Sequence, residues 1–94
     1  MKEVERIFIE KAVERAGIFL YSREIALEFV KACGNENIHL FGIDGFFLKD
    51  NRIQPSMTDS IDFSSLFFEG DIYQKAINFL EVRSDNMFFE ITCA

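Results

Sequence analysis

The sequence contains few of the residues on which enzymes and metalloproteins usually depend. It has one histidine, two cysteines and one proline in 94 residues, and no tryptophan. A nucleophilic triad would have to combine His39 with a loop serine and an acid, and no Gly-x-Ser-x-Gly elbow is present. The acids Asp59, Asp62, Glu69 and Asp71 do not have the spacing of a calcium loop. We therefore expect a protein that is not an enzyme, without cofactor or metal.

Long apolar runs are also missing. No stretch approaches the roughly 20 residues that a membrane-spanning helix needs. The first six residues mix acids and bases, where a secretory signal would carry a cationic start and an apolar run. Cys33 and Cys93 lie far apart in sequence and form no Cys-x-x-Cys pair, which is typical of reduced thiols. These features predict a cytoplasmic protein with no membrane partner.

Cations are scarce in the middle of the chain. The first 31 residues balance six acids with six bases. The segment 44–71 has two cations, Lys49 and Arg52, against six carboxylates: Asp44, Asp50, Asp59, Asp62, Glu69 and Asp71. A net charge of -6 and a pI of about 4.7 argue against nucleic acid as a direct ligand. This asymmetry indicates a cationic protein partner.

Apolar and aromatic residues are plentiful, with twelve phenylalanines and a hydrophobic fraction of 49%. A chain of 94 residues forms one domain, 1–94, and has little spare core. Since each buried aromatic ring removes roughly 150 to 250 Å² from water, we expect a core rich in phenylalanine.

Apolar spacing predicts helices in the first third of the chain. Residues 2–16 have an apolar stripe at helical spacing, and Gly17 is a natural left-handed stop. Ser22 is placed to cap a second helix, which Gly34 and Asn35 end. The intervening segment 18–21 is too short to classify by its period and is compatible with a buried connection.

The middle of the chain predicts a strand and a turn. Residues 38–48 read as a strand, Asp50-Asn51 as a turn, and 52–54 as a return strand that Pro55 ends, followed by a loop over 56–69. A rival interpretation places a type I′ hairpin at Asp44-Gly45. We favour one long, irregular strand, in which Gly42 and Gly45 mark a bulge or a close backbone approach.

The last third predicts a helix and a final strand. Asp71 and Gln74 resemble a capping box for a helix over 72–83, and residues 87–93 alternate as a terminal strand. The predicted fold is α+β, with two N-terminal helices, a small mixed or antiparallel sheet, and a third helix before the last strand. The doublets Phe46-Phe47 and Phe88-Phe89 place aromatic side chains on both sheet faces. We therefore expect either helices on both sides of the sheet or an apolar face left for a partner, and we favour helices on both sides.

Several segments resemble a known class of proteins. They are Phe41-Gly42-Ile43-Asp44-Gly45-Phe46, Gln54-Pro55-Ser56, Ser60-Ile61-Asp62-Phe63-Ser64, Ala76-Ile77-Asn78-Phe79-Leu80 and Phe88-Phe89-Glu90-Ile91. The sequence is similar to small bacterial immunity proteins of polymorphic toxins, including contact-dependent growth inhibition systems. The resemblance implies that the chain binds and neutralises a cognate toxin C-terminal domain. Many such toxins attack nucleic acid with a cationic cleft, which an acidic inhibitor can fill.

The acidic loop is the predicted binding surface. We expect Asp59, Asp62, Glu69 and Asp71 to contact the toxin, with Phe67 or Phe68 as an apolar anchor. Asp44 lies within the predicted strand, where it can be satisfied internally. In the segment 60–65, polar side chains can instead satisfy backbone amides while Ile61 and Phe63 pin the loop to the core, and both roles can coexist.

Two other functions stay open. The chain can be a self-associating structural or regulatory module without catalytic activity, in which an apolar sheet face pairs with a second copy as a homodimer. It can also be a small hydrolase that uses the loop carboxylates, although the expected motifs are missing. A monomer in sedimentation would argue strongly against the first of these.

Overall fold

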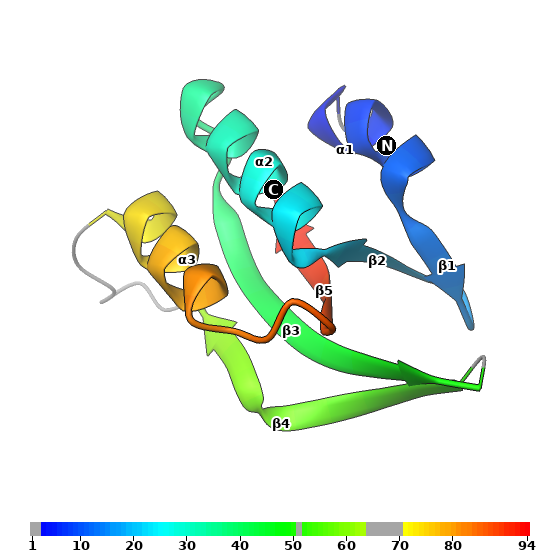
Figure 1. The fold of residues 1–94 in the computed structure, drawn as a ribbon. Coiled ribbons are helices and arrows are strands. Elements are labelled where there is room, and N and C mark those ends of the chain that lie inside the picture. Colours follow the sequence, from blue (N-terminus) through cyan, green and yellow to red (C-terminus); the bar gives the residue numbers. More distant parts are fainter. Residues whose placement is uncertain (1–2, 51, 64–70) are drawn as a thin grey trace.

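The computed structural model describes residues 3–50, 52–63 and 71–94. Its strands form one antiparallel sheet in the order β1-β2-β5-β3-β4 (Figure 1). The elements in chain order are α1 (Glu3–Phe8), a 3-10 turn η1 (Ile9–Lys11), β1 (Val13–Arg15), β2 (Ile18–Ser22), α2 (Arg23–Asn35), β3 (Leu40–Lys49), β4 (Arg52–Asp62), α3 (Ile72–Glu81) and β5 (Phe88–Cys93).

The N-terminal region corrects the predicted fold. Among the described residues, α1 is the only α-helix before the first strand, so the expectation of two N-terminal helices is wrong, and a β1–β2 hairpin separates α1 from α2. The hairpin turn is formed by Ala16 and Gly17, whose φ angles are 53° and 79°. A two-residue type I′ turn requires positive φ at both positions. Gly17 therefore serves a hairpin turn, and the predicted helix over 2–16 ends as an α-helix at Phe8.

The second predicted helix is confirmed as α2, although it follows two strands. The Ser22 hydroxyl accepts a hydrogen bond from the Ile25 backbone N–H at 3.3 Å, as an N-cap does. The helix ends at Asn35, where the sequence predicted its end. Residues 18–21, which the sequence left unclassified, belong to β2.

The long irregular strand is confirmed as β3, with a register shift between Asp44 and Gly45. Three residues of β4, 57–59, bulge out between the pairs Asp44↔Ser60 and Gly45↔Ser56. The predicted end of the return strand at Pro55 is wrong, because β4 continues to Asp62. Since β4 is an edge strand, the missing N–H of a proline is tolerated on its outer side.

The last two elements match their predictions closely. Asp71 accepts hydrogen bonds from the backbone N–H groups of Tyr73 (2.9 Å) and Gln74 (3.1 Å), so it is the N-cap of α3. The Gln74 side chain donates to Asn78 instead of completing a capping box. In β5, Phe89, Ile91 and Cys93 are buried, as the predicted alternation requires.

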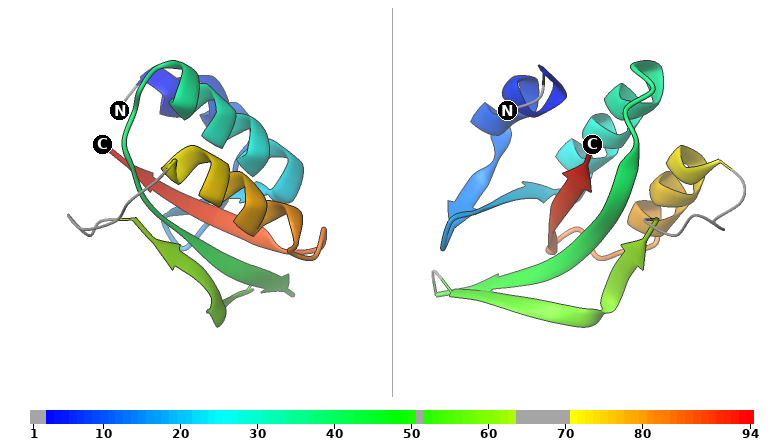
Figure 2. Two further views of the ribbon diagram at one scale, coloured as in Figure 1. Left: turned by 90° about the vertical axis from the view of Figure 1, so that its left-hand side faces the viewer. Right: turned by 180° about the vertical axis from the view of Figure 1, so that it is seen from behind.

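The three helices lie on one side of the sheet (Figures 1 and 2). The core between them is rich in phenylalanine: Phe29 contacts Phe8 and Tyr21 at centroid distances of 5.3 and 5.2 Å, and Phe79 contacts Phe89 at 6.3 Å. The favoured expectation of helices on both faces is therefore wrong for the described residues. Within that part of the chain, no helix is long and apolar enough to cross a membrane.

Candidate binding surface on the open face of the sheet

The sheet face opposite the helices divides into an apolar half and an acidic half. Side chains alternate along each strand, so residues paired across the sheet share a face. The apolar half is one row of residues paired across four strands: Ser22, Phe88, Phe46 and Pro55. Phe46 in that row is only 7% exposed although no described helix covers it. The apolar half is therefore not freely exposed at Phe46.

The acidic half consists of the next two rows. Glu90 pairs with Asp44, which pairs with Ser60. In the following row Gly42 is flanked by Thr92 on β5 and Asp62 on β4. We call Asp44, Asp62 and Glu90 the acidic face. The strands β5, β3 and β4 each contribute one of its three carboxylates.

The like charges of Asp44 and Glu90 stand directly opposite each other. Such cross-strand pairs destabilise a sheet. Partial burial, and secondarily the charge of Asp44, raise the pKa of Glu90 above its usual value. The arrangement therefore reduces the stability of the free protein, which is a cost that a binding partner of opposite charge would offset.

A groove of about 420 Å³ lies beside Asp44 and Asp62 of the acidic face. Its lining residues come from three strands and are Phe41, Gly42, Asp44, Ser60, Ile61, Asp62 and Thr92. A Cβ at position 42 would lie 3.0 Å from the Ile61 carbonyl oxygen, and this close approach of the backbone favours glycine here. Phe41 is 38% exposed at the groove and makes an edge contact with His39 at 5.1 Å between centroids. The groove thus combines carboxylates with one exposed aromatic ring.

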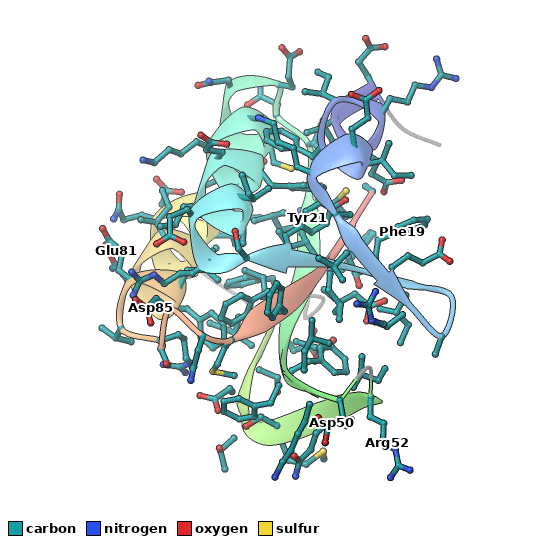
Figure 3. All side chains as sticks on the ribbon, turned by 45° about the vertical axis from the view of Figure 1, so that its right-hand side comes forward. Phe19, Tyr21, Asp50, Arg52, Glu81 and Asp85 are labelled. Carbon is teal, nitrogen blue, oxygen red and sulfur yellow. The ribbon has the colours of Figure 1, made fainter. Side chains whose placement is uncertain are left out.

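The two cations of the middle segment lie at the far end of the β3–β4 hairpin. Lys49 pairs with Arg52 next to the hairpin turn, and Figure 3 shows Arg52 at that tip. Lys49 is five residues from Asp44, which corresponds to about 16 Å along a strand. Because side chains alternate along a strand, the Lys49 side chain also lies on the opposite sheet face from that of Asp44. Neither cation is placed to neutralise the acidic face.

The structure separates the acids that the sequence predicted as one surface. Asp62 lies on the acidic face, whereas Asp71 caps α3. Asp59 lies in the β4 bulge, where its carboxylate accepts a hydrogen bond from Ser56 (2.5 Å) and forms an ion pair with Arg83 (Nε to Oδ1, 2.9 Å). The predicted contacts Phe67, Phe68 and Glu69 lie outside the described residues. The toxin-binding roles of all six residues stay predictions.

Sequence reasoning did not combine Asp44 and Glu90 with Asp62. Asp44 and Glu90 are 46 positions apart in the sequence, and only the pairing of β5 with β3 brings them together. The available signal was the alternation of residues 87–93, which already placed Glu90 opposite the buried residues. The strand order was the missing information, since it is determined by the whole fold.

No metal site emerges from the described residues. Across 3–50, 52–63 and 71–94, no group of three or more histidine, cysteine, aspartate or glutamate side chains is arranged to hold a metal ion. The resemblance noted from the sequence has no independent support from relatives: no protein-family model matches the chain, and the search of curated proteins finds no match. What the structure offers chemically is an anionic, partly aromatic binding surface.

Proposed function

We propose that this chain is an immunity protein that binds and neutralises a cognate bacterial toxin domain through its acidic face. The observation that carries the proposal is the placement of three carboxylates and a groove on a sheet face that no described helix covers. The inhibition requires binding and no chemistry. The partner is a cationic protein domain, such as the substrate cleft of a nuclease toxin.

Electrostatics gives this surface a reason to bind such a domain. Asp44 and Glu90 repel each other in the free protein, and an arginine or lysine between them would turn this repulsion into attraction. A concentrated negative field also accelerates association with a cationic cleft. Phe41 at the groove supplies the aromatic contact that interfaces use as an anchor.

The resemblance to immunity proteins falls on the same part of the molecule. Two of the resembling segments, 41–46 and 60–64, include the β3 and β4 residues that line the groove. A third, 88–91, contains Glu90. The similarity and the anionic surface are separate observations, and both support a role in binding a cationic partner.

Co-expression with the toxin domain tests the proposal. The chain is expressed with the C-terminal domain encoded immediately upstream of its gene, and host survival and co-purification are measured. We expect rescue and a complex whose association slows as salt rises. A toxic domain that the chain neither rescues nor binds would reject this pairing.

Charge reversal then locates the surface. Reversing Asp44, Asp62 and Glu90 to lysine should slow association by roughly tenfold or more and remove most of its salt dependence. Reversing three exposed acids elsewhere, Glu36, Glu81 and Asp85, changes the net charge equally and is the matched control. Equal slowing in both variants would refute a localised acidic site.

The earlier predicted residues can be tested without damaging the fold. Asparagine caps a helix about as well as aspartate, so Asp71→Asn removes the charge and keeps the cap of α3. If Asp71 contacts the toxin, this variant should bind more weakly while its thermal stability stays unchanged. Phe67→Ala, Phe68→Ala and Glu69→Gln complete the same comparison.

The self-associating module is the second candidate, because the open sheet face is a surface that another copy of the chain can cover. In a two-fold interface over this face, the acids of one copy would lie near those of the other. That repulsion favours a foreign cationic partner over a second copy. Sedimentation at micromolar concentration separates the two, since a stable dimer at low salt would favour self-association.

A further inference from the structure

The two cysteines converge in the core although they are distant in sequence. Cys33 lies near the end of α2 and Cys93 in β5, and they are 0% and 5% exposed. The backbone accounts for the meeting. The Ile38 N–H donates to the Cys33 carbonyl at 2.9 Å, and Leu40 then pairs with Cys93 across the sheet. The chain that leaves α2 therefore runs directly beside the strand that contains Cys93.

The two thiols and a carboxylate form a series of neighbouring side chains. The Cys93 side chain lies close enough to Cys33 to raise the pKa of the Cys33 thiol, and the Cys93 thiol donates to Glu5 Oε1 at 3.5 Å. Burial is the main reason that the pKa of Cys33 is raised to about 12, and the neighbouring Cys93 adds to it. Three elements, α2, β5 and α1, thus place two thiols and a proton acceptor in contact.

A small cavity adjoins this series on the Glu5 side. It has a volume of about 160 Å³, and Glu5, Ile9, Tyr21 and Ile91 are among its lining residues. Ile91 and Cys93 are both buried and lie on the same face of β5, two residues apart. The cavity is large enough for a molecule the size of hydrogen peroxide, and it places that molecule near the carboxylate that accepts the Cys93 proton. Figure 3 shows Tyr21, one of its walls, between the ribbons of α1 and α2.

We propose that Cys33 and Cys93 are an oxidation site at which a peroxide forms a disulfide that joins α2 to β5. In the first step Glu5 accepts the Cys93 proton as the sulfur attacks a peroxide oxygen. The O–O bond breaks, and the released hydroxide takes the proton from Glu5 and leaves as water. In the second step Cys33 sulfur attacks the Cys93 sulfenic acid. The S–S bond forms, the S–O bond breaks, and hydroxide leaves with the Cys33 proton as a second water. Two thiols and one peroxide give one disulfide and two waters.

Oxidation of the folded protein tests this proposal. The reduced, folded chain is treated with hydrogen peroxide in the absence of denaturant. It is then unfolded and alkylated, and its mass is measured by mass spectrometry. We expect a monomer whose mass is two hydrogens lower than that of the reduced chain and in which no cysteine is alkylated. Treatment with dithiothreitol should restore the mass and both thiols. Because the disulfide closes a long loop, the Tm should rise by roughly 10 °C or more. A folded protein that keeps both thiols alkylatable, or that forms only disulfide-linked dimers, would overturn the proposal.

Variants separate this chemistry from accidental oxidation. Glu5→Gln should slow the reaction by about tenfold or more, as expected for loss of a general base, whereas the exposed Glu3→Gln serves as its matched control. Cys33→Ala should halt the reaction at a Cys93 sulfenic acid, which dimedone traps. Equal oxidation rates in Glu5→Gln and Glu3→Gln would refute the role of Glu5. A Cys33→Ala variant in which dimedone labels nothing would refute Cys93 as the site of the first step.

Discussion

The two faces of the sheet illustrate two different uses of the same strands. Toward the helices, Phe89, Ile91 and Ile43 are packed into a continuous apolar core. On the other face, the neighbouring positions Asp44 and Glu90 place like charges opposite each other. The first face accounts for why the chain folds. The second reduces stability locally, and such a cost is typical of surfaces that bind a partner.

The largest expected effect contrasts one phenylalanine from the core with one at the groove. Phe89 is fully buried against Phe79, whereas Phe41 is 38% exposed. Phe89→Ala should lower the free energy of unfolding by about 3 to 5 kcal/mol, because it leaves a cavity in the core. Phe41→Ala should cost roughly 1 kcal/mol or less. Denaturant unfolding measures both, and similar losses would contradict the division between the faces.

A smaller effect is expected at the bulge of β4, where Asp59 forms an ion pair with Arg83. Arg83 approaches Asp59 with Nε 2.9 Å from Oδ1, and its guanidinium lies 4.1 Å from the Phe79 ring centroid. The Nε–H lacks good hydrogen-bond geometry, so the attraction is mainly electrostatic. Both side chains are about one quarter exposed or less, at 21% and 24%. Arg83→Met should therefore cost about 1 to 2 kcal/mol.

A double-mutant cycle tests whether this cost comes from the pair. Asp59→Asn keeps the shape of the side chain and removes its charge. If the ion pair holds the bulge, the loss in the double variant should be smaller than the sum of the two single losses. Fully additive losses would show that Arg83 acts through packing on Phe79 alone.

The sequence predicted those parts of the fold that depend on local chemistry. Ser22 and Asp71 were recognised as caps because their side chains satisfy nearby backbone N–H groups. The irregular β3 was recognised from Gly42 and Gly45. A Cβ at Gly45 would lie 2.7 Å from the Asp59 carbonyl oxygen, so the bulge needs glycine there.

The sequence did not predict what pairing across the sheet decides. The apolar stripe of residues 2–16 fits a helix, yet Val13 and Leu20 pair as strands because Ala16 and Gly17 close a hairpin. Pro55 was read as a strand end since its position at a sheet edge was unknown. The acidic face was missed for the same reason, because Glu90 reaches Asp44 only through the order β5-β3-β4.

The smallest effect, and the most direct test of the open face, comes from neutralising Glu90. Its pKa is raised in the folded protein, so the folded state holds this proton more tightly than the unfolded state, whose value is near 4.5. The cost of burying the charged carboxylate, and secondarily of its repulsion by Asp44, is therefore absent well below the unfolded pKa and is fully present once the pH has risen through the folded pKa. Glu90→Gln should stabilise the protein by about 0.5 kcal/mol at pH 7 and by nearly nothing at pH 4.

The control for Glu90→Gln is a substitution of Asp44, the residue that pairs with Glu90 across the sheet. Asp44→Asn removes the repulsion but leaves a partly buried charge on Glu90, so it should gain less than Glu90→Gln, and the double variant should gain about as much as Glu90→Gln alone. Glu36→Gln, an exposed acid on the other side of the molecule's core, should show no comparable pH-dependent gain. If Glu90→Gln is more stable yet binds the toxin domain less tightly, the charge pair is retained for binding at the expense of stability. A variant that gains stability and keeps full affinity would leave the repulsion without a functional reason.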